Sequence, residues 1–214
     1  MKTYTVHRAS DQFDFQHSAE DEAWAGSVPE SLVDCVTGEK TSLATRFRVL
    51  WDTEYLYARF LVEDREIIAS HTERDAPLYE EDVVEIFLSP TGSRHYYYEF
   101  NFSPKGGIFD ALVLNDDGRA GHGRGTLDAF IEWNASELKI QTELHDTDWW
   151  VVAAAIPFRQ LHLAEHRPPE PGEIWRANFC RIEYGLPETE YSAWNPPELV
   201  DFHTSERFGQ LIFV

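Results

Sequence analysis

The sequence predicts an all-β protein, an antiparallel β-sandwich of immunoglobulin or jelly-roll type with one or two short helices, in a single domain of residues 1–214. Short segments in which apolar residues alternate with polar ones recur along the chain. Pro and Gly clusters typical of turns separate these segments, and no long segment has the periodicity of a helix. This combination is typical of a sandwich of short strands.

The expected elements follow in chain order from this pattern. The first strand is TRFRVLW (45–51), and in the next, YLYARFLVED (55–64), every second residue from Leu56 to Val62 is apolar and would face the core. The segments VVEIFLS (83–89) and YYYEFNF (96–102) alternate in the same way. Further strands are expected at 107–114, 137–144, 149–156, 173–184 and 208–214. Short helices are expected at 18–24 and at 157–163, where a proline follows a strand.

Composition limits the class of partner. The chain has 38 acidic and 18 basic residues, a formal net charge of −20, and a surface this negative repels nucleic acid and anionic lipid. It is compatible with neutral ligands and with metal cations. Hydrophobic residues make up 43% and aromatic residues 14%, which is enough for a sizeable core and also suits sites that stack on flat ligands. We expect a monomer.

The two cysteines, Cys35 and Cys180, have no metal-binding or redox spacing. They are either buried free thiols or one disulfide. The N-terminus has no apolar segment of a signal peptide, and no apolar run is long enough to span a membrane. The sequence therefore indicates a cytoplasmic protein, or a periplasmic or secreted one from which the leader has been removed. The glycine-rich segment 116–125 lacks the ending of a phosphate-binding loop and is predicted to be a connection.

Two adjacent strands carry the candidate polar site. If 83–89 and 96–102 pair as a hairpin with an even register sum, Glu85 shares a sheet face with Glu99 and Asn101. Buried and unpaired, these groups would cost several kcal/mol, so this face is not ordinary core. It is either the solvent side of the sheet or a polar floor that meets the hydroxyl groups of a sugar or a bound cation.

Two aromatic residues in loops are candidates for the walls of such a site. Tyr79 lies in the loop before the strand 83–89, and Trp194 lies in YSAWNPP. Their flat faces could contact the C–H surface of a pyranose ring. Alternatively, Trp194 packs beneath its own loop.

The acidic loop before the strand 83–89 is a candidate calcium site. Calcium takes six to eight oxygen ligands from flexible carboxylates and carbonyls. The candidate ligands are Asp64, Asp75 and Asp82, with Glu80 and Glu81 nearby, and no EF-hand motif is present. Nine histidines occur without the spacing of a zinc site.

Five stretches taken together resemble carbohydrate-binding module family 9 in order and spacing, from about Asp21 to Val214. They are RVLWDTEYLYARFLVED, PLYEEDVVEIFLSP, YYEFNFSPKGGIFDA, WRANFCRIE and SAWNPP followed by FHTSERFGQLIF. The resemblance implies an antiparallel β-sandwich that binds mono- or oligosaccharides without catalysis, in well-known members at chain ends. Such modules accompany glycoside hydrolases that act on plant polysaccharides such as xylan and cellulose, and some hold structural calcium.

Carried over by position, the resemblance implies an aromatic pair of Tyr79 and Trp194 over a floor of Glu85 and Asn101. Tyr79 stands where well-known members have Trp. Glu99 stands where a basic or amide residue is expected.

The residues are compatible with two classes of function. In a non-catalytic binder, the two aromatics would stack on the sugar ring while Glu85, Asn101 and Arg181 bind its hydroxyls. In a glycoside hydrolase, Glu85 and Glu99 would serve as general acid and as nucleophile or base. A haem-binding sandwich is a third and weaker hypothesis, because the only methionine is Met1 and a pair of axial histidines would have to meet by coincidence.

Overall fold

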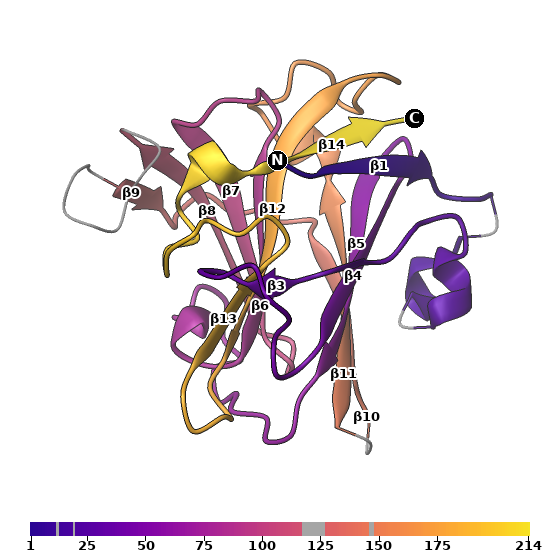
Figure 1. Cartoon of the computed structure of the whole chain (residues 1–214). Coiled ribbons are helices and arrows are strands. Elements are labelled where there is room, and N and C mark those ends of the chain that lie inside the picture. Colours follow the sequence, from indigo (N-terminus) through magenta and orange to yellow (C-terminus); the bar gives the residue numbers. More distant parts are fainter. Residues whose placement is uncertain (12, 19, 117–126, 146–147) are drawn as a thin grey trace.

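The computed structural model describes residues 1–11, 13–18, 20–116, 127–145 and 148–214, and it confirms the all-β prediction (Figure 1). Apart from Asp116, the glycine-rich segment predicted as a connection lies outside the described residues. The only helices among the described residues are 3₁₀ turns: η1 (Phe15–His17), η2 (Asp21–Trp24), η3 (Leu78–Glu80), η4 (Phe158–Gln160) and η5 (Ser205–Arg207). None of the described helices has the length and apolar character needed to cross a membrane.

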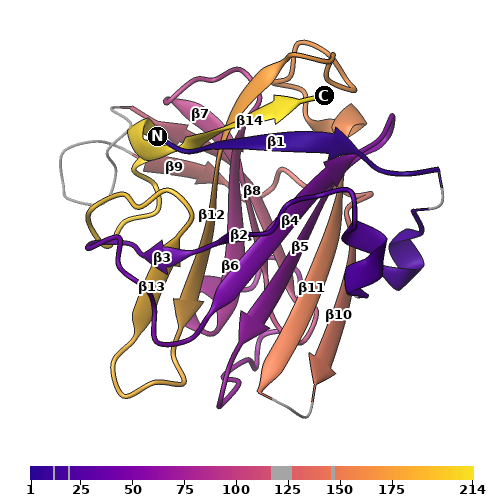
Figure 2. The ribbon, with the colours of Figure 1, turned by 45° about the vertical axis from the view of Figure 1, so that its right-hand side comes forward.

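The strands lie in two layers that face each other (Figures 1 and 2). One layer has the order β10 (Lys139–His145), β11 (Trp149–Pro157), β5 (Tyr55–Glu63), β4 (Thr45–Trp51), with β2 (Glu30–Ser31) paired to β4. The other has the order β14 (Gly209–Phe213), β12 (Ile174–Glu183), β6 (Val83–Ser89), β7 (Tyr96–Phe102), β8 (Ile108–Asn115), β9 (Leu127–Phe130). Strand β13 (Glu190–Ala193) pairs with β12 and with β3 (Val33–Asp34).

Strand β1 (Thr3–Arg8) joins the two layers. Residues 3–6 pair with β14, and residues 7–8 pair with β4 in the opposite layer. Both pairings are parallel, whereas the other pairings among the described strands are antiparallel, so the sheet is mixed where the sequence predicted a purely antiparallel one.

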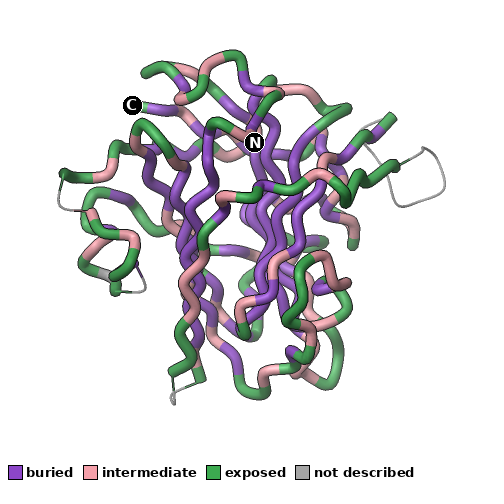
Figure 3. The backbone as a smooth tube through the Cα atoms, turned by 180° about the vertical axis from the view of Figure 1, so that it is seen from behind, coloured by how far each residue is buried: buried purple, intermediate pink, exposed green. Residues whose placement is uncertain are grey.

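The main core lies between the layers and follows the predicted alternation. All four apolar residues at alternate positions of β5 are buried in it, as are Val84, Ile86 and Leu88 of β6. Trp150 at the start of β11 is completely buried in the same core. In Figure 3 the buried residues run along the central strands, and exposed residues gather in the connections.

A second apolar cluster covers the outer face of β6, β7, β8 and β12. It contains both cysteines, which are free and buried, so they do not form the alternative disulfide. Burial raises the pKa of the Cys35 thiol to about 12. Phe202 and Phe208, in the segment that precedes β14, also belong to this cluster. The face that carries Glu85 is therefore covered by chain segments, and the hypothesis of an open solvent side is wrong.

Candidate functional site

A pocket of about 530 Å³ opens on this outer face, and we call it the Glu85 pocket. Its lining combines an acidic floor with apolar and aromatic walls. The residues are Asp75, Pro77, Tyr79, Glu85, Phe87, Glu99, Phe109, Leu127, Ala129, Ile131, Ile182, Phe202 and His203.

The pairing of β6 with β7 builds the floor. Glu85 lies opposite Asn101 and Phe87 lies opposite Glu99, so the register sum is even, which is the condition under which the sequence placed Glu85, Glu99 and Asn101 on one face. Because side chains alternate along a strand, these four residues share one face. On its other side Glu85 lies opposite Cys180 of β12. The local sequence of two adjacent strands therefore fixes two carboxyl groups as diagonal neighbours in the middle of the sheet.

The two acids of the floor have different environments. Glu99 accepts a hydrogen bond of 2.9 Å from the Asn101 side-chain amide, and its other oxygen lies 3.8 Å from Nε2 of His203. Glu85 is 3% exposed and has no hydrogen-bond donor in the described part of the chain. Burial, together with the neighbouring Glu99, raises the pKa of Glu85 well above its ordinary value. The protonated form of Glu85 is thereby favoured.

A hydrogen-bonded chain orients His203. The Asn115 amide donates to the Tyr97 hydroxyl at 3.3 Å and to the His203 carbonyl at 2.8 Å. The Tyr97 hydroxyl lies 2.8 Å from Nδ1 of His203 and is free to donate to it. A proton on Nε2 then points toward Glu99.

Tyr79 forms part of one wall. Its neighbour in η3, Leu78, is buried in the second apolar cluster, and the Tyr184 hydroxyl donates to the Tyr79 carbonyl at 3.1 Å. Tyr79 itself is 45% exposed and its ring meets Phe109 edge to face, with ring centroids 6.1 Å apart. Because its neighbours hold the backbone, the aromatic ring is presented at the mouth of the pocket.

Trp194 does not form the opposite wall, and this prediction is wrong. Its backbone N–H donates to the Phe179 carbonyl, which extends the pairing of β13 and β12 by one residue. The alternation then turns Trp194 away from the outer face and into the main core, where it is completely buried. A side chain at Gly209 would collide with the Trp194 ring, 2.4 Å from the Cβ position, so glycine is required there.

Residues that the sequence did not single out form the rest of the walls. Phe202 and His203 come from the segment before η5, and Leu127, Ala129 and Ile131 come from β9 and the residue after it. The alternation of residues in LDAFI (127–131) is a pattern from which strand β9 could have been predicted. Nothing in the sequence indicates that Phe202 folds back over β6.

Arg181 is also absent from the pocket. It follows Cys180 in β12 and so lies on the opposite face, where it is 1% exposed. It donates to the Thr45 hydroxyl at 3.1 Å and forms ion pairs with Glu183 and, at 3.6 Å, with Asp64. Its role is to neutralise buried carboxylates.

The predicted calcium ligands separate into two places. Asp64 and Asp82 come together with Glu183 in a buried group, whereas Asp75 lines the Glu85 pocket. The carboxylate oxygens of the group already accept hydrogen bonds: Asp82 from two backbone N–H groups, Asp64 from the Trp150 indole and from a backbone N–H, and Glu183 from Arg181 and a backbone N–H. These residues do not fit a calcium ion, because the Arg181 guanidinium is the cation among them.

The buried acids make folding dependent on pH. Burial raises the pKa of Asp82 to about 6 and that of Glu183 to about 7, so the folded state binds protons more tightly than the unfolded state. Their contribution to stability is therefore fully present below the unfolded pKa near 4 and is lost as the pH rises through 6–7. Asp34 and Glu81 have lowered pKa values and act in the opposite sense, below about pH 4.

We expect the free energy of unfolding to be about 1–3 kcal/mol higher at pH 5 than at pH 8. Urea unfolding at matched ionic strength measures it. A free energy of unfolding that is equal at pH 5 and pH 8, or higher at pH 8, would contradict the protonation of Asp82 and Glu183 in the folded protein.

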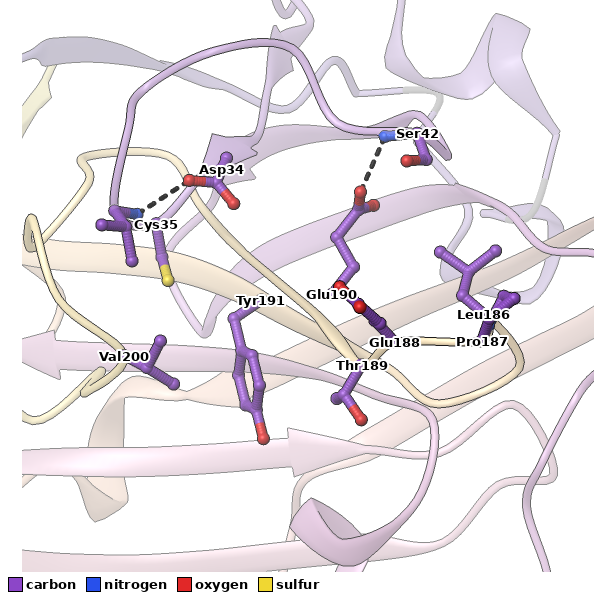
Figure 4. Close-up of a pocket in the computed structure, with 11 residues that line it drawn as sticks. Asp34, Cys35, Ser42, Leu186, Pro187, Glu188, Thr189, Glu190, Tyr191 and Val200 are labelled. Atoms are coloured by element: carbon purple, nitrogen blue, oxygen red, sulfur yellow. Dashed lines mark hydrogen bonds between the residues drawn. The ribbon is translucent and has the colours of Figure 1, made fainter.

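A second hollow, of about 440 Å³, lies beside β3 and β13 (Figure 4). Two of its acids are satisfied by nearby backbone: Glu190 accepts from the Ser42 N–H at 2.8 Å, and Asp34 accepts from the Thr37 N–H at 2.7 Å. Because both carboxylates already accept hydrogen bonds from backbone N–H groups of the protein, fewer hydrogen-bond acceptors remain for a ligand in this hollow than in the Glu85 pocket.

Comparisons with known proteins agree with this architecture. A proposed carbohydrate-binding protein from Bacteroides uniformis superposes with a TM-score of 0.78 at 17% identity, covering 100% of this chain and 99% of that one. A family 9 carbohydrate-binding module from Caldicellulosiruptor kristjanssonii, in complex with cellotriose, has a TM-score of 0.68 at 18% identity, covering 99% of this chain and 93% of that one. These likenesses show the fold.

Sequence comparison identifies the family. An Arthroderma benhamiae protein named "Extracellular protein" is 27% identical over 188 residues, which cover 84% of this chain and 82% of that protein. The sequence profile of carbohydrate-binding family 9 matches residues 25–213, nearly the whole chain. The chain therefore belongs to carbohydrate-binding family 9.

Proposed function

We propose that the protein is a non-catalytic carbohydrate-binding module and that the Glu85 pocket receives the sugar ring. Family membership supports carbohydrate binding, and modules of the same fold from C. kristjanssonii have been solved with cellotriose and with glucose. The observation that carries the assignment to this pocket is the combination of aromatic and apolar walls with a polar floor on which the Glu85 carboxyl group has no hydrogen-bond partner among the described residues.

The geometry explains how a pyranose would be held. Tyr79 offers a ring face to the apolar C–H surface, and Phe109 supports it from the side. On the floor, Glu85 and Glu99 would accept hydrogen bonds from hydroxyl groups, whereas Asn101 does not line the pocket. A protonated Glu85 could also donate one to a ring or glycosidic oxygen. The other wall is formed by Phe202 and the β9 residues in place of the predicted Trp194.

We expect Tyr79→Ala to weaken the binding of cellotriose and glucose at least about tenfold, corresponding to about 1.4 kcal/mol or more of lost ring contact. Isothermal titration calorimetry measures it. Stability should change little, because the Tyr79 side chain is 45% exposed. Tyr96→Ala is the matched control, since Tyr96 is 37% exposed on the same sheet and does not line the pocket. Equal affinities for wild type and Tyr79→Ala would remove Tyr79 from the site.

The glycoside hydrolase alternative uses the same two acids and is tested in the same samples. Glu85 and Glu99 would have to act as an acid and a base with different pKa values, and their unequal surroundings are compatible with this requirement. Incubation with xylan, cello-oligosaccharides and cellulose, followed by an assay for new reducing ends, separates the two functions. Turnover that Glu85→Gln and Glu99→Gln abolish would make the protein an enzyme.

A further inference from the structure

Acidic side chains dominate the charge of the Glu85 pocket. Three of its lining residues are acids, Asp75, Glu85 and Glu99, and neither Lys nor Arg lines it among the described residues. The one basic side chain, His203, is already engaged with Tyr97 and lies 3.8 Å from Glu99.

Elsewhere the chain supplies buried acids with partners. Asp110 accepts hydrogen bonds from the Arg74 guanidinium at 2.5 Å and from the Ala135 N–H at 2.6 Å. Asp64 and Glu183 both form ion pairs with Arg181. Among the buried acids of the described residues, Glu85 is the one without a hydrogen-bond donor. An unpaired buried carboxyl group disfavours folding, so a position that retains one is a candidate for ligand contact.

One further acceptor of a lining residue is unsatisfied: Oδ1 of Asp75 has no donor in the part of the chain that the structure describes. The unpaired Oδ1 of Asn101 is not available to a ligand, because Asn101 is completely buried and does not line the pocket. A positive charge beside Glu85 would release its proton, so that Glu85, like Glu99, would accept hydrogen bonds as a carboxylate. A hydroxyl group brings one donor and no charge, whereas an ammonium group brings three donors and the positive charge that two neighbouring carboxyl groups lack.

The walls suit the rest of such a ligand. Tyr79, Phe109 and Phe202 offer aromatic surface to the C–H face of a sugar ring, and aromatic faces also attract cations. We propose that the Glu85 pocket selects sugars that carry a free amine, such as a 2-amino-2-deoxyhexose, over their neutral counterparts, with the ammonium group bound between Glu85 and Glu99. This inference rests on the proposed function and specifies the ligand class of the same pocket.

Calorimetric titration of the wild-type protein with glucose, glucosamine and N-acetylglucosamine at pH 7 tests the proposal. We expect glucosamine to bind at least about tenfold more tightly than glucose and than N-acetylglucosamine, in which the amine is uncharged. The advantage should shrink as salt is raised, because it depends on charge. Equal affinities for glucose and glucosamine would overturn the amine preference and leave sugar binding intact. If none of these sugars nor cellotriose binds, the proposed function fails as well.

Two variants locate the effect. In Glu99→Gln the ratio of glucosamine affinity to glucose affinity should fall to about one, since the amide retains a hydrogen-bonding group without the charge. Glu39→Gln is the control, because it removes the same charge from an exposed position outside the pocket and should leave the preference unchanged. A preference that survives in a folded Glu99→Gln variant would contradict the proposed ammonium position. Cyclohexylamine, an amine without hydroxyl groups, should bind weakly; tight binding would overturn selection for a sugar.

Discussion

Replacing Arg181 with Met is expected to lower the free energy of unfolding by about 3–5 kcal/mol, because it leaves Asp64, Asp82 and Glu183 buried without their cation. Urea unfolding at pH 8 measures the loss. It should be smaller at pH 5, since protonation neutralises the same carboxyl groups; burial already raises the pKa of Asp82 to about 6 and that of Glu183 to about 7.

Arg159→Met provides the comparison for an exposed ion pair. Arg159 pairs with Glu137, but its side chain is 70% exposed, so its loss should cost less than about 1 kcal/mol. If Arg181→Met cost no more than Arg159→Met, or if calcium restored its stability fully, Arg181 would not be the cation that this cluster needs.

Trp194→Ala is expected to lower the free energy of unfolding by about 3–5 kcal/mol through the cavity that it leaves in the main core. The ring is completely buried and packs edge to face against Tyr4, Phe47 and Phe179. Sugar affinity, measured at a temperature where the variant remains folded, should stay within about twofold of the wild-type value.

Two variants sharpen this test. Trp194→Phe should cost less than Trp194→Ala, because the phenyl ring fills part of the space and the indole N–H has no hydrogen-bond partner to lose. Leu144→Ala, at a side chain that is 50% exposed, should change stability by less than about 1 kcal/mol. A Trp194→Ala protein of normal stability that no longer binds sugar would place Trp194 at the ligand after all.

Local patterns predicted the strands that alternate clearly and the polar floor of the pocket. The even register of β6 and β7 follows from a short hairpin with one buried apolar face, so Glu85, Glu99 and Asn101 could be placed on one face before the structure was known. Strands β1, β2, β3, β9 and β13 were missed. The pairings of β1 with β14 and of β3 with β13 join segments far apart in sequence, which no local pattern encodes, whereas β12 and β13 form a local hairpin.

Which residues form the walls of the pocket could not be predicted from local sequence patterns. Whether Trp194 faces a ligand or the core is decided by a single hydrogen bond, from its N–H to Phe179, that continues the alternation of β13. Arg181 was misplaced for a related reason: its neighbours in the strand, Cys180 and Ile182, occupy the outer face and turn it inward. Phe202 and His203 reach the site only because the segment before β14 folds over β6.

A crystal of the protein soaked in cellotriose tests the central claim most directly. We expect a sugar ring in the Glu85 pocket, in contact with the face of Tyr79, with a hydroxyl oxygen within about 2.6–3.2 Å of the Glu85 carboxyl group. A sugar bound instead in the hollow beside Asp34 and Tyr191, or a Glu85 pocket without sugar at saturating concentration, would contradict it.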